Sequence, residues 1–249
     1  MKITFADAKT WRYVIRSISK FIETGVAKVT EDGFRFKALD PSKVILLDFI
    51  IPRESFEEFD LDGKESVDVP FNVEDLAKIL RTASKDDKIS LGMERNKLNV
   101  ALITKGVERI FTLPLLTLEM EEVPELSGLE LKNRFRMLGP TYYDVINSIE
   151  DLGDMIKLKG TEDKLIIMSI SDLGEAEIDL DIESGTLTEV IVEEPGEASY
   201  GMEYFSNLKQ VGRVAETVLI EFSTAMPCHM VFELAQGARM EVYVAPRTE

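Results

Sequence analysis

Apolar residues recur at a helical spacing near the start of the chain. Between Trp11 and Ile22 they stand three and four positions apart, which is typical of an amphipathic helix with one buried face. We therefore predict a helix over about 7–24. Its opposite face has four basic residues and no acidic one, at Lys9, Arg12, Arg16 and Lys20. Their spacing of 3, 4 and 4 places them within an arc of roughly 80°.

This basic face has two interpretations. Like charges one turn apart repel each other and slightly destabilise their own helix, so a polyanionic partner is the simplest reason to keep them together. An ordinary solvated polar face is the alternative, and for an isolated helix it is the more common one. The first helix taken by itself fits both interpretations.

The chain repeats its pattern once, at an offset of about 131 residues. Trp11 and Ile18 of the first copy correspond to Tyr142 and Ile149 of the second, and the Thr-Glu-Asp turn at 30–32 corresponds to that at 161–163. Because one offset holds over so many positions, we interpret the sequence as a duplicated unit. Two half-domains are expected at 1–114 and 131–249, joined at 115–130 by an acidic linker with interleaved apolar residues.

Strands and helices are predicted to follow one another in the same order in both halves. Alternating apolar and polar positions predict strands at 2–5, 26–29, 34–39 and 44–51, and again at 131–138, 155–159, 164–169 and 175–182. Helices are expected at 7–24, 72–84, 140–152 and 201–212, with two or three strands closing each half. Asn72 is the expected N-cap of the second of these helices. Since strands outnumber helices and hairpin-like turns join them, the predicted fold class is α+β, with antiparallel sheets and the helices on one face.

Basic residues also lie on one face of two later helices. They are Lys78, Arg81 and Lys85 in the first half, and Lys209 and Arg213 on the equivalent helix of the second half. The counterpart of the first helix differs, with Tyr143, Asn147 and Asp151 at the positions of Arg12, Arg16 and Lys20. No aromatic residues alternate with these charges and no helix-turn-helix pattern is evident. The sequence therefore favours binding to a phosphate backbone without base recognition.

Composition restricts where such a partner binds. The 249 residues are 45% hydrophobic, enough for a packed core, and have a formal net charge of -17. A protein this acidic does not bind nucleic acid over its general surface, so the positive charge must be concentrated in one region. A single cysteine excludes an intrachain disulfide and is consistent with a reducing compartment. Without a long apolar run or a signal-like leader, we expect a cytoplasmic protein with no membrane contact.

Residues suited to catalysis are sparse. The only histidine, His229, adjoins Cys228 in a strand-like segment, where neighbouring side chains point to opposite faces, so we expect no catalytic pair there. Asp60 and Asp62, like the Glu-Asp-Lys sequence at 162–164, lie where turns are expected. No phosphate-binding glycine motif is present. We therefore predict no catalytic residue, metal site, cofactor or enzymatic activity; a metal-dependent nuclease using the scattered carboxylates is the most distant alternative.

Five short segments carry a family resemblance through their order and spacing. They are Ala-Leu-Asp-Pro-Ser-Lys-Val at 38–44, Leu-Pro-Leu at 113–115, Ser-Tyr-Gly-Met-Glu-Tyr at 199–204, Met-Pro at 226–227 and Val-Ala-Pro-Arg at 244–247. Over its full length the chain resembles the sliding clamps of the proliferating cell nuclear antigen family, especially the archaeal members. The resemblance implies a DNA-clamp fold: three subunits, each of two similar halves, form a ring with sheets outside and helices lining a hole around duplex DNA.

By this resemblance the basic helix faces point at DNA. The DNA-facing residues would be Lys9, Arg12, Arg16, Lys20, Lys78, Arg81, Lys209 and Arg213. Their contacts would be loose and largely through water, so that the ring slides, while the acidic exterior confines DNA to the channel. The implied function is that of a nucleoid-associated processivity factor, which tethers DNA polymerase and other replication and repair enzymes to duplex DNA of any sequence.

The resemblance also implies a site for partner proteins. In the family, an apolar pocket beside the linker takes a short peptide from DNA polymerases, flap endonucleases and DNA ligases, and a clamp loader is a further expected partner. Here the pocket would comprise Leu39, Lys43, Val44, Val123, Pro227, Tyr243, Ala245 and Pro246. Ordinary core or loop packing is the alternative role for each of these residues.

The second half departs from the family pattern on its first helix. Asp144, Asn147 and Asp151 stand where relatives often have positive charge. Assembly as a homotrimer and assembly as one specialised subunit of a ring of three different chains both stay open. The alternative function is a protein-interaction hub or checkpoint-type clamp that loads on DNA only in such a mixed ring.

Overall fold

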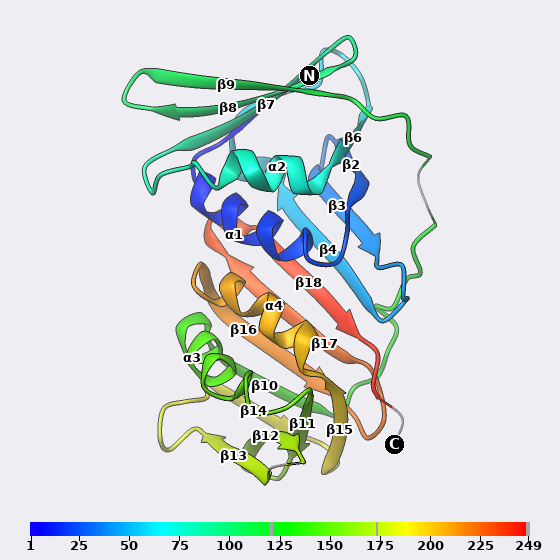
Figure 1. Cartoon of the computed structure of the whole chain (residues 1–249), viewed down its shortest axis with the longest axis vertical. Coiled ribbons are helices and arrows are strands. Elements are labelled where there is room, and N and C mark those ends of the chain that lie inside the picture. Colours follow the sequence, from blue (N-terminus) through cyan, green and yellow to red (C-terminus); the bar gives the residue numbers. More distant parts are fainter. Residues whose placement is uncertain (120–121, 173, 248–249) are drawn as a thin grey trace. The chain divides into compact units, whose positions relative to one another are not determined.

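Two compact units make up the chain in a computed structural model that describes residues 1–119, 122–172 and 174–247 (Figure 1). The first unit comprises Met1–Pro41, Leu47–Val123 and Ala235–Met240, and the second comprises Ser42–Leu46, Pro124–Leu234 and Glu241–Glu249. Positions 120 and 121 of the predicted linker lie outside the described residues. The half-domain boundaries placed at 114 and 131 from the sequence stay a prediction.

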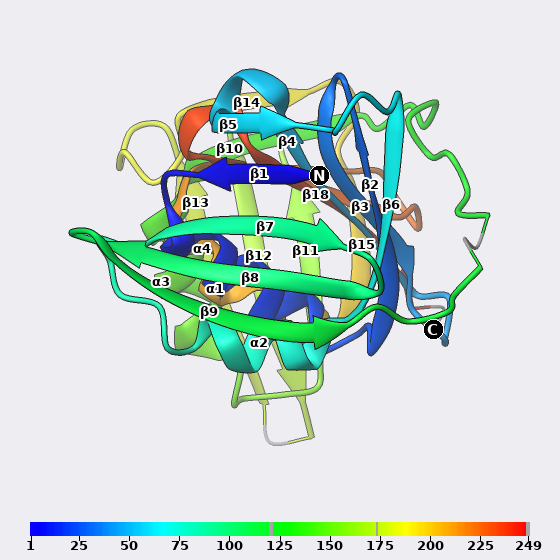
Figure 2. The same ribbon diagram turned by 90° about the horizontal axis from the view of Figure 1, so that it is seen from above.

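Two antiparallel sheets and two helices form the first unit. Its elements are β1 (Lys2–Phe5), α1 (Ala8–Ile18), β2 (Thr24–Thr30), β3 (Gly33–Leu39), β4 (Ile45–Pro52, in this unit from Leu47), a 3-10 turn (Arg53–Ser55), β5 (Phe56–Asp60), β6 (Ser66–Asn72), α2 (Val73–Leu80), β7 (Lys88–Glu94), β8 (Lys97–Thr104) and β9 (Val107–Pro114). One sheet has the order β5-β1-β7-β8-β9 and the other has β4-β3-β2-β6. Figure 2 shows β1, β7, β8 and β9 side by side.

The second unit has the same composition of elements. They are β10 (Asn133–Leu138), α3 (Gly139–Ile149), β11 (Met155–Gly160), β12 (Lys164–Ser171), β13 (Gly174–Asp181), β14 (Glu189–Val192), β15 (Gly196–Gly201), α4 (Met202–Gly212), β16 (Ala215–Phe222), β17 (Cys228–Leu234), a 3-10 turn (Ala235–Gly237, assigned to the first unit) and β18 (Arg239–Val244, in this unit from Glu241). Its sheets have the orders β14-β10-β16-β17-β18 and β13-β12-β11-β15.

One order of elements occurs twice along the described chain. A strand, a helix, five strands, a helix and three strands run from β1 to β9, and the same series runs from β10 to β18. Strands pair antiparallel with their neighbours, for example β1 with β7 and β10 with β16. The predicted α+β class with antiparallel sheets is confirmed.

Helix α1 begins as predicted but ends earlier. Asp7 caps its start, because its Oδ1 accepts hydrogen bonds from the backbone N–H groups of Lys9 (2.9 Å) and Thr10 (3.2 Å). After Ile18 the chain tightens, with the N–H of Lys20 donating to the carbonyl of Ser17 at 3.1 Å. Residues from 24 onward are strand β2 and pair with β6. The predicted helix over 7–24 is therefore wrong beyond residue 18, and Lys20 lies outside the helix.

Helix α2 also ends before its predicted limit. The Oδ1 of Asn72 accepts from the N–H of Asp75 at 2.9 Å, which confirms Asn72 as the cap. The helix ends at Leu80, and the carboxylate of Asp87 accepts from the N–H of Ser84 at 2.7 Å. This contact holds a turn where the sequence predicted helix, because Asp87 competes for backbone groups that a helix would use.

Aromatic side chains of the sheets cover the buried faces of the helices. The ring centroid of Trp11 on α1 lies 4.9 Å from Phe34 and 5.4 Å from Phe49. Tyr142 on α3, the counterpart of Trp11, packs edge-on against Phe232 at 5.2 Å. The apolar face of α1 is buried from Trp11 to Ile18, which confirms it as the core-facing side and directs the basic face outward.

Candidate nucleic-acid interface

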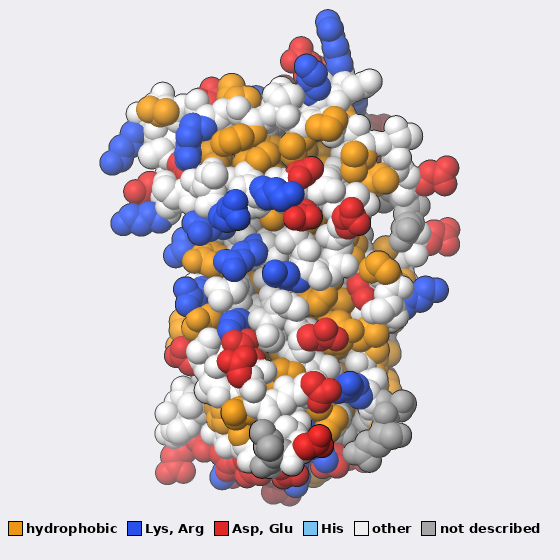
Figure 3. Space-filling view, in the orientation of Figure 1, with side chains coloured by type: hydrophobic (Ala, Val, Ile, Leu, Met, Phe, Trp, Pro, Cys, Tyr) orange, Lys and Arg blue, Asp and Glu red, His pale blue; other side chains and the backbone are white. Residues whose placement is uncertain are grey.

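A basic surface covers α1 and the adjoining part of α2 in the first unit. Figure 3 shows lysine and arginine side chains gathered there. Lys9 and Arg16 on α1 are exposed, as is Lys20 just after it and Arg81 at the end of α2. Within the described residues, no ion pair involves any of these four side chains. Their charges are therefore available to an external anion.

Arg12 has a positional role on this surface. Its Nη1 donates to the carbonyl of Ala83 at 3.1 Å, and its guanidinium lies 5.9 Å from the ring centre of Tyr13. The carbonyl is neutral, so the contact joins α1 to the turn after α2 without removing the charge. Arg12 is half-buried, so it attracts an external anion mainly through its electrostatic field and not through direct contact.

Lys78 on α2 is compensated by its own helix. Its Nζ lies 3.3 Å from carboxylate oxygens of Glu74 and Asp75, one turn earlier. The hydrogen bonds that Lys78 donates to Asp75 and Glu74 raise its pKa above the ordinary value. The lysine is exposed, so these contacts are screened and can exchange for a stronger anion.

Two residues that the sequence did not single out hold the turn after α2. Arg109 on β9 donates from Nη1 to the carbonyl of Thr82 at 3.2 Å and pairs with the carboxylate of Asp87, which is 1% exposed. Because Asp87 also binds the N–H of Ser84, the turn that follows Arg81 has one conformation. The pairing joins residues on separate elements, so no local sequence signal marks it.

The basic residues of the second unit bind side chains of α3 instead of standing free. Lys209 on α4 pairs with Glu150 and donates to Oδ1 of Asn147 at 3.0 Å, leaving its side chain 14% exposed. Arg213 donates from Nη2 to the hydroxyl of Tyr143 at 2.5 Å, and its guanidinium lies 4.2 Å from the centre of that ring. Asn147 and Tyr143 occupy positions that are basic in the first half. Glu150, the cap at the end of α3, neutralises Lys209, whereas Tyr143 is neutral and holds Arg213 in place without removing its charge.

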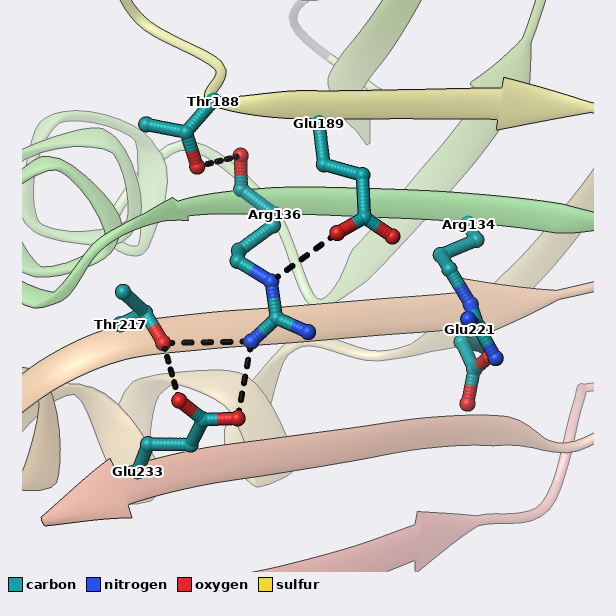
Figure 4. A network of polar contacts seen from close by, with 7 residues as sticks. All are labelled: Arg134, Arg136, Thr188, Glu189, Thr217, Glu221 and Glu233. Atoms are coloured by element: carbon teal, nitrogen blue, oxygen red, sulfur yellow. Dashed lines mark hydrogen bonds and ion pairs between the residues drawn. The ribbon is translucent and has the colours of Figure 1, made fainter.

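Arginines on the sheet of the second unit are also neutralised. Figure 4 shows Arg136 on β10 between Glu189, 3.2 Å from its Nε, and Glu233, 2.9 Å from Nη1. Arg134 pairs with Glu221 at 2.7 Å. These cations lie among carboxylates and offer no free positive surface. Among the predicted DNA-facing residues, those that are exposed and bound to no described side chain are Lys9, Arg16, Lys20 and Arg81, on and next to α1 and at the end of α2.

Glu150→Gln tests whether the ion pair with Glu150 keeps Lys209 from contacting DNA. The variant should lose about 1–3 kcal/mol of unfolding free energy, because a largely buried ammonium loses its charged partner. It should also steepen the salt dependence of DNA binding by about one phosphate contact per subunit. Chemical denaturation and fluorescence anisotropy on a duplex at several salt concentrations measure the two effects. Asp144→Asn, an exposed acid on the same helix, is the matched control; equal effects of both variants would contradict a specific role of Glu150.

The predicted partner-pocket residues are only partly brought together within one unit. Val44, Ala245 and Pro246 line a common hollow of about 780 Å³ in the second unit, and the N–H of Ala245 donates to the carbonyl of Val44 at 2.8 Å. Tyr243 lines a different hollow of the same unit. The remaining predicted members lie elsewhere: Leu39 and Val123 belong to the first unit, and Lys43 and Pro227 to the second but outside the linings of these two hollows.

Residues considered for catalysis occupy structural positions. Cys228 is buried, while His229 points to the other side of β17 and contacts Glu221, which confirms the opposite orientation expected from the strand. Asp60 accepts from the N–H of Asp62 at 2.8 Å, an ordinary turn contact. In the described part of the chain, no three histidine, cysteine or acidic residues lie together in a way that could hold a metal ion. Nor does any described helix combine the length and apolar character needed to cross a membrane.

Comparisons with known proteins cover the whole chain. Residues 1–123 match the family described as proliferating cell nuclear antigen, N-terminal domain. The chain is 36% identical to DNA polymerase sliding clamp 3 of Aeropyrum pernix, over 98% of this chain and 97% of that protein. It is 34% identical to DNA polymerase sliding clamp 3 of Sulfurisphaera tokodaii, over 100% of both.

Solved structures agree with these relatives. A chain in the crystal structure of the PCNA2–PCNA3 complex from Sulfolobus tokodaii superposes with a TM-score of 0.93 at 33% identity, over 100% of both chains. PCNA of Thermococcus kodakaraensis has the same fold, with a TM-score of 0.90 at 22% identity and 99% coverage of both chains.

Proposed function

Since the chain belongs to the proliferating cell nuclear antigen family, whose relatives are DNA polymerase sliding clamps, we propose that it encircles duplex DNA and tethers DNA polymerase to it. The family resemblance inferred from the sequence is confirmed. The observation that carries the proposal for this chain is the basic surface of α1, with exposed and unpaired Lys9 and Arg16 in a protein of net charge -17.

Electrostatics supports a sliding contact rather than a fixed one. Lys9, Arg16, Lys20 and Arg81 are exposed, and no aromatic ring of the described residues stacks on them, so they suit phosphates and not base edges. Each exchanges a condensed counterion on DNA, which gives a weak and salt-dependent attraction. The acidic remainder of the surface repels DNA, so the duplex stays where the basic helices are. Retention then depends on closure of the ring and not on affinity.

Two different sheet edges support ring formation. β9 is the last strand of its sheet and exposes Val107 and Ile110 by 63% and 61%. β13 is the last strand of another sheet, and its exposed residues include Glu175, Glu177 and Asp179. An unpaired edge offers backbone N–H and C=O groups to another strand. Because the two edges differ, pairing one with the other between subunits is head-to-tail, and a head-to-tail interface whose rotation closes forms a ring in which neither of these two edges is free.

Partner enzymes are proposed to bind through a short peptide. The hollow at Val44, Ala245 and Pro246 supports this site, since these apolar side chains suit an extended segment with a few apolar anchors. Flap endonuclease, DNA ligase and the clamp loader are proposed partners beside the polymerase. The chain would bring these enzymes to DNA at the nucleoid without being an enzyme itself.

A mixed ring is the second candidate assembly. Helix α3 has no basic residue, Glu150 neutralises Lys209, and Tyr143 holds the guanidinium of Arg213, so this chain's second half is a weak DNA contact. A ring of three copies would repeat that weakness three times, whereas different subunits could supply the missing charge. Relatives named sliding clamp 2 and 3, and a solved PCNA2–PCNA3 complex, show that such specialised chains exist in similar proteins.

A loading assay tests the proposal. The chain, alone or with paralogous subunits and a clamp loader, should remain on nicked circular DNA and run off the same DNA after linearisation, because topology and not affinity retains it. Gel filtration separates bound from free protein.

Val107→Asp combined with Ile110→Asp, which places charge on the β9 edge, should abolish retention on circular DNA. Equal retention on circular and linear DNA would contradict the ring and indicate direct binding.

A further inference from the structure

His229 lines a hollow of about 560 Å³ in the second unit. Residues between 126 and 132, which span the end of the predicted linker, line this hollow together with Arg134 of β10, Glu193 and residues of β16, β17 and β18. β18 contributes Tyr243, a residue of the predicted partner-peptide pocket. His229 is the one histidine of the chain, and it lies beside this tyrosine.

The imidazole of His229 is held on three sides. Its ring stacks on that of Tyr243, with centroids 4.3 Å apart and planes inclined by 13°. Nδ1 lies 2.8 Å from Oε2 of Glu221, and Nε2 lies 3.7 Å from Oε2 of Glu241. Arg134 in turn binds Glu221 at 2.7 Å, the pair labelled in Figure 4. At 3.7 Å the Nε2 contact is electrostatic, and the described residues give this buried nitrogen no hydrogen bond.

Protonation changes these contacts in opposite ways. The imidazolium has N–H groups on both nitrogens and attracts both carboxylates. The neutral ring that donates from Nδ1 to Glu221 turns the lone pair of Nε2 toward the carboxylate of Glu241, which repels it. When the imidazole loses its proton, its attraction to Glu241 is therefore lost. The imidazole is then no longer held in the orientation in which it stacks on Tyr243.

Charged groups on every neighbouring element affect the protonation equilibrium of His229. Burial lowers the pKa of His229, but the hydrogen bond with Glu221 and the negative charges of Glu221 and Glu241 outweigh it and raise the pKa above the ordinary 6.5. Charged residues of the hollow are Glu130, Lys132, Arg134, Glu193, Glu221 and Glu241. Because the folded-state pKa is raised, the stabilisation is complete below the ordinary value and is lost as pH rises through the raised one.

We propose that His229 is a positioning residue of the partner-peptide pocket: it holds the ring of Tyr243, and peptide binding weakens when the imidazole loses its proton. The inference rests on the proposed function, since it takes the pocket to bind a peptide segment of a partner enzyme. The resemblance implies Tyr243 as a member of the pocket, and Tyr243 lies two residues before Ala245, which lines the hollow proposed for the segment. A ring that reorients there changes the shape that the apolar anchors of the segment meet.

Peptide affinity as a function of pH tests the role. A fluorescent peptide with the clamp-binding segment of a DNA polymerase is titrated by anisotropy from about pH 6 to about pH 9, where such a histidine ionises. Wild-type affinity should fall about two- to tenfold with rising pH, the size expected for one aromatic stack. His229→Phe keeps the stack without the proton and should show no such pH dependence. Glu241→Gln should move the midpoint to lower pH.

Controls separate this role from simple folding effects. Glu233→Gln removes a carboxylate from the same strand outside the hollow and should leave the midpoint unchanged. NMR of the single imidazole gives its pKa directly, and saturating peptide should raise that pKa, because coupling between proton and peptide is reciprocal. If His229→Phe keeps the pH dependence of peptide affinity, or if the peptide does not change the imidazole pKa of the wild type, the role of His229 is contradicted while the proposed partner site stands. No peptide binding at any pH contradicts the proposed partner site and overturns the inference with it.

Discussion

Lys9→Glu combined with Arg16→Glu should weaken direct binding of the assembled ring to duplex DNA about tenfold or more. It should also reduce the slope of log affinity against log salt by about 2 per subunit, because two phosphate contacts are lost. Both side chains are exposed and unpaired in the described structure, so the full charge change reaches the solvent. Polymerase processivity on primed circular DNA should fall in parallel. Anisotropy titrations over a salt series measure the first effect and primer extension the second.

The double variant is expected to stay folded. Glu at position 9 lies in the first turn of α1, where a negative charge is favoured by the helix dipole, and both changes relieve repulsion within the basic face. Lys28→Glu with Lys64→Glu makes the same charge change at exposed positions of the first unit away from the helices. If this control pair weakens DNA binding as much, a general charge effect and not the α1 surface is responsible. Peptide binding should be unchanged in both double variants.

Trp11→Ala should destabilise the first unit by about 3–5 kcal/mol, the range for removing a large buried aromatic side chain. Trp11 is 1% exposed and contacts Phe34 and Phe49, so its loss leaves a cavity beneath the helix that presents the basic face. DNA binding should decline together with folding, in contrast to the surface variant. Because the chain has one tryptophan, unfolding is followed by circular dichroism in denaturant and not by tryptophan fluorescence.

Trp11→Phe is the matched control for the cavity. The indole Nε1 is buried without a hydrogen-bond partner in the described residues, so phenylalanine removes an unsatisfied donor while keeping most of the ring. We expect a loss below about 1.5 kcal/mol, typical of a modest change in core volume. A loss in Trp11→Phe as large as in Trp11→Ala would show that the indole nitrogen, and not the packing, stabilises this core.

Local patterns predicted the fold class and the outward basic face correctly. The period of apolar residues that buries Trp11 and Ile18 necessarily turns Lys9 and Arg16 to the other side of the same helix, and both facts follow from helix geometry alone. The repeat predicted that α3 and α4 would succeed one another as α1 and α2 do. Asn72 was recognised as a cap because its hydrogen bond spans only three residues.

Helix ends and charge compensation were beyond such patterns. Residues 19–24 retain a helical period, yet α1 ends at Ile18 and the chain enters β2 at Thr24, where Thr24 pairs with Asn72 of β6, far along the sequence. The carboxylate of Asp87 stops α2 through Ser84 and is itself held by Arg109 on β9. These contacts join residues that are distant in the sequence, so the local spacing of apolar residues does not predict them.

The sequence by itself determined the family, the α+β class, the duplicated order of elements and the asymmetry of the basic faces, because all of these depend on residue type and local spacing. Only the tertiary structure decided which charges are free. It placed Glu150 against Lys209 and Tyr143 against Arg213, and left Lys9 and Arg16 unpaired. It also brought His229, Glu221, Glu241 and Tyr243 together from three strands. The physical reason is the same in each case: electrostatic pairing depends on distance in space, which neighbouring helices and strands set and the linear order does not.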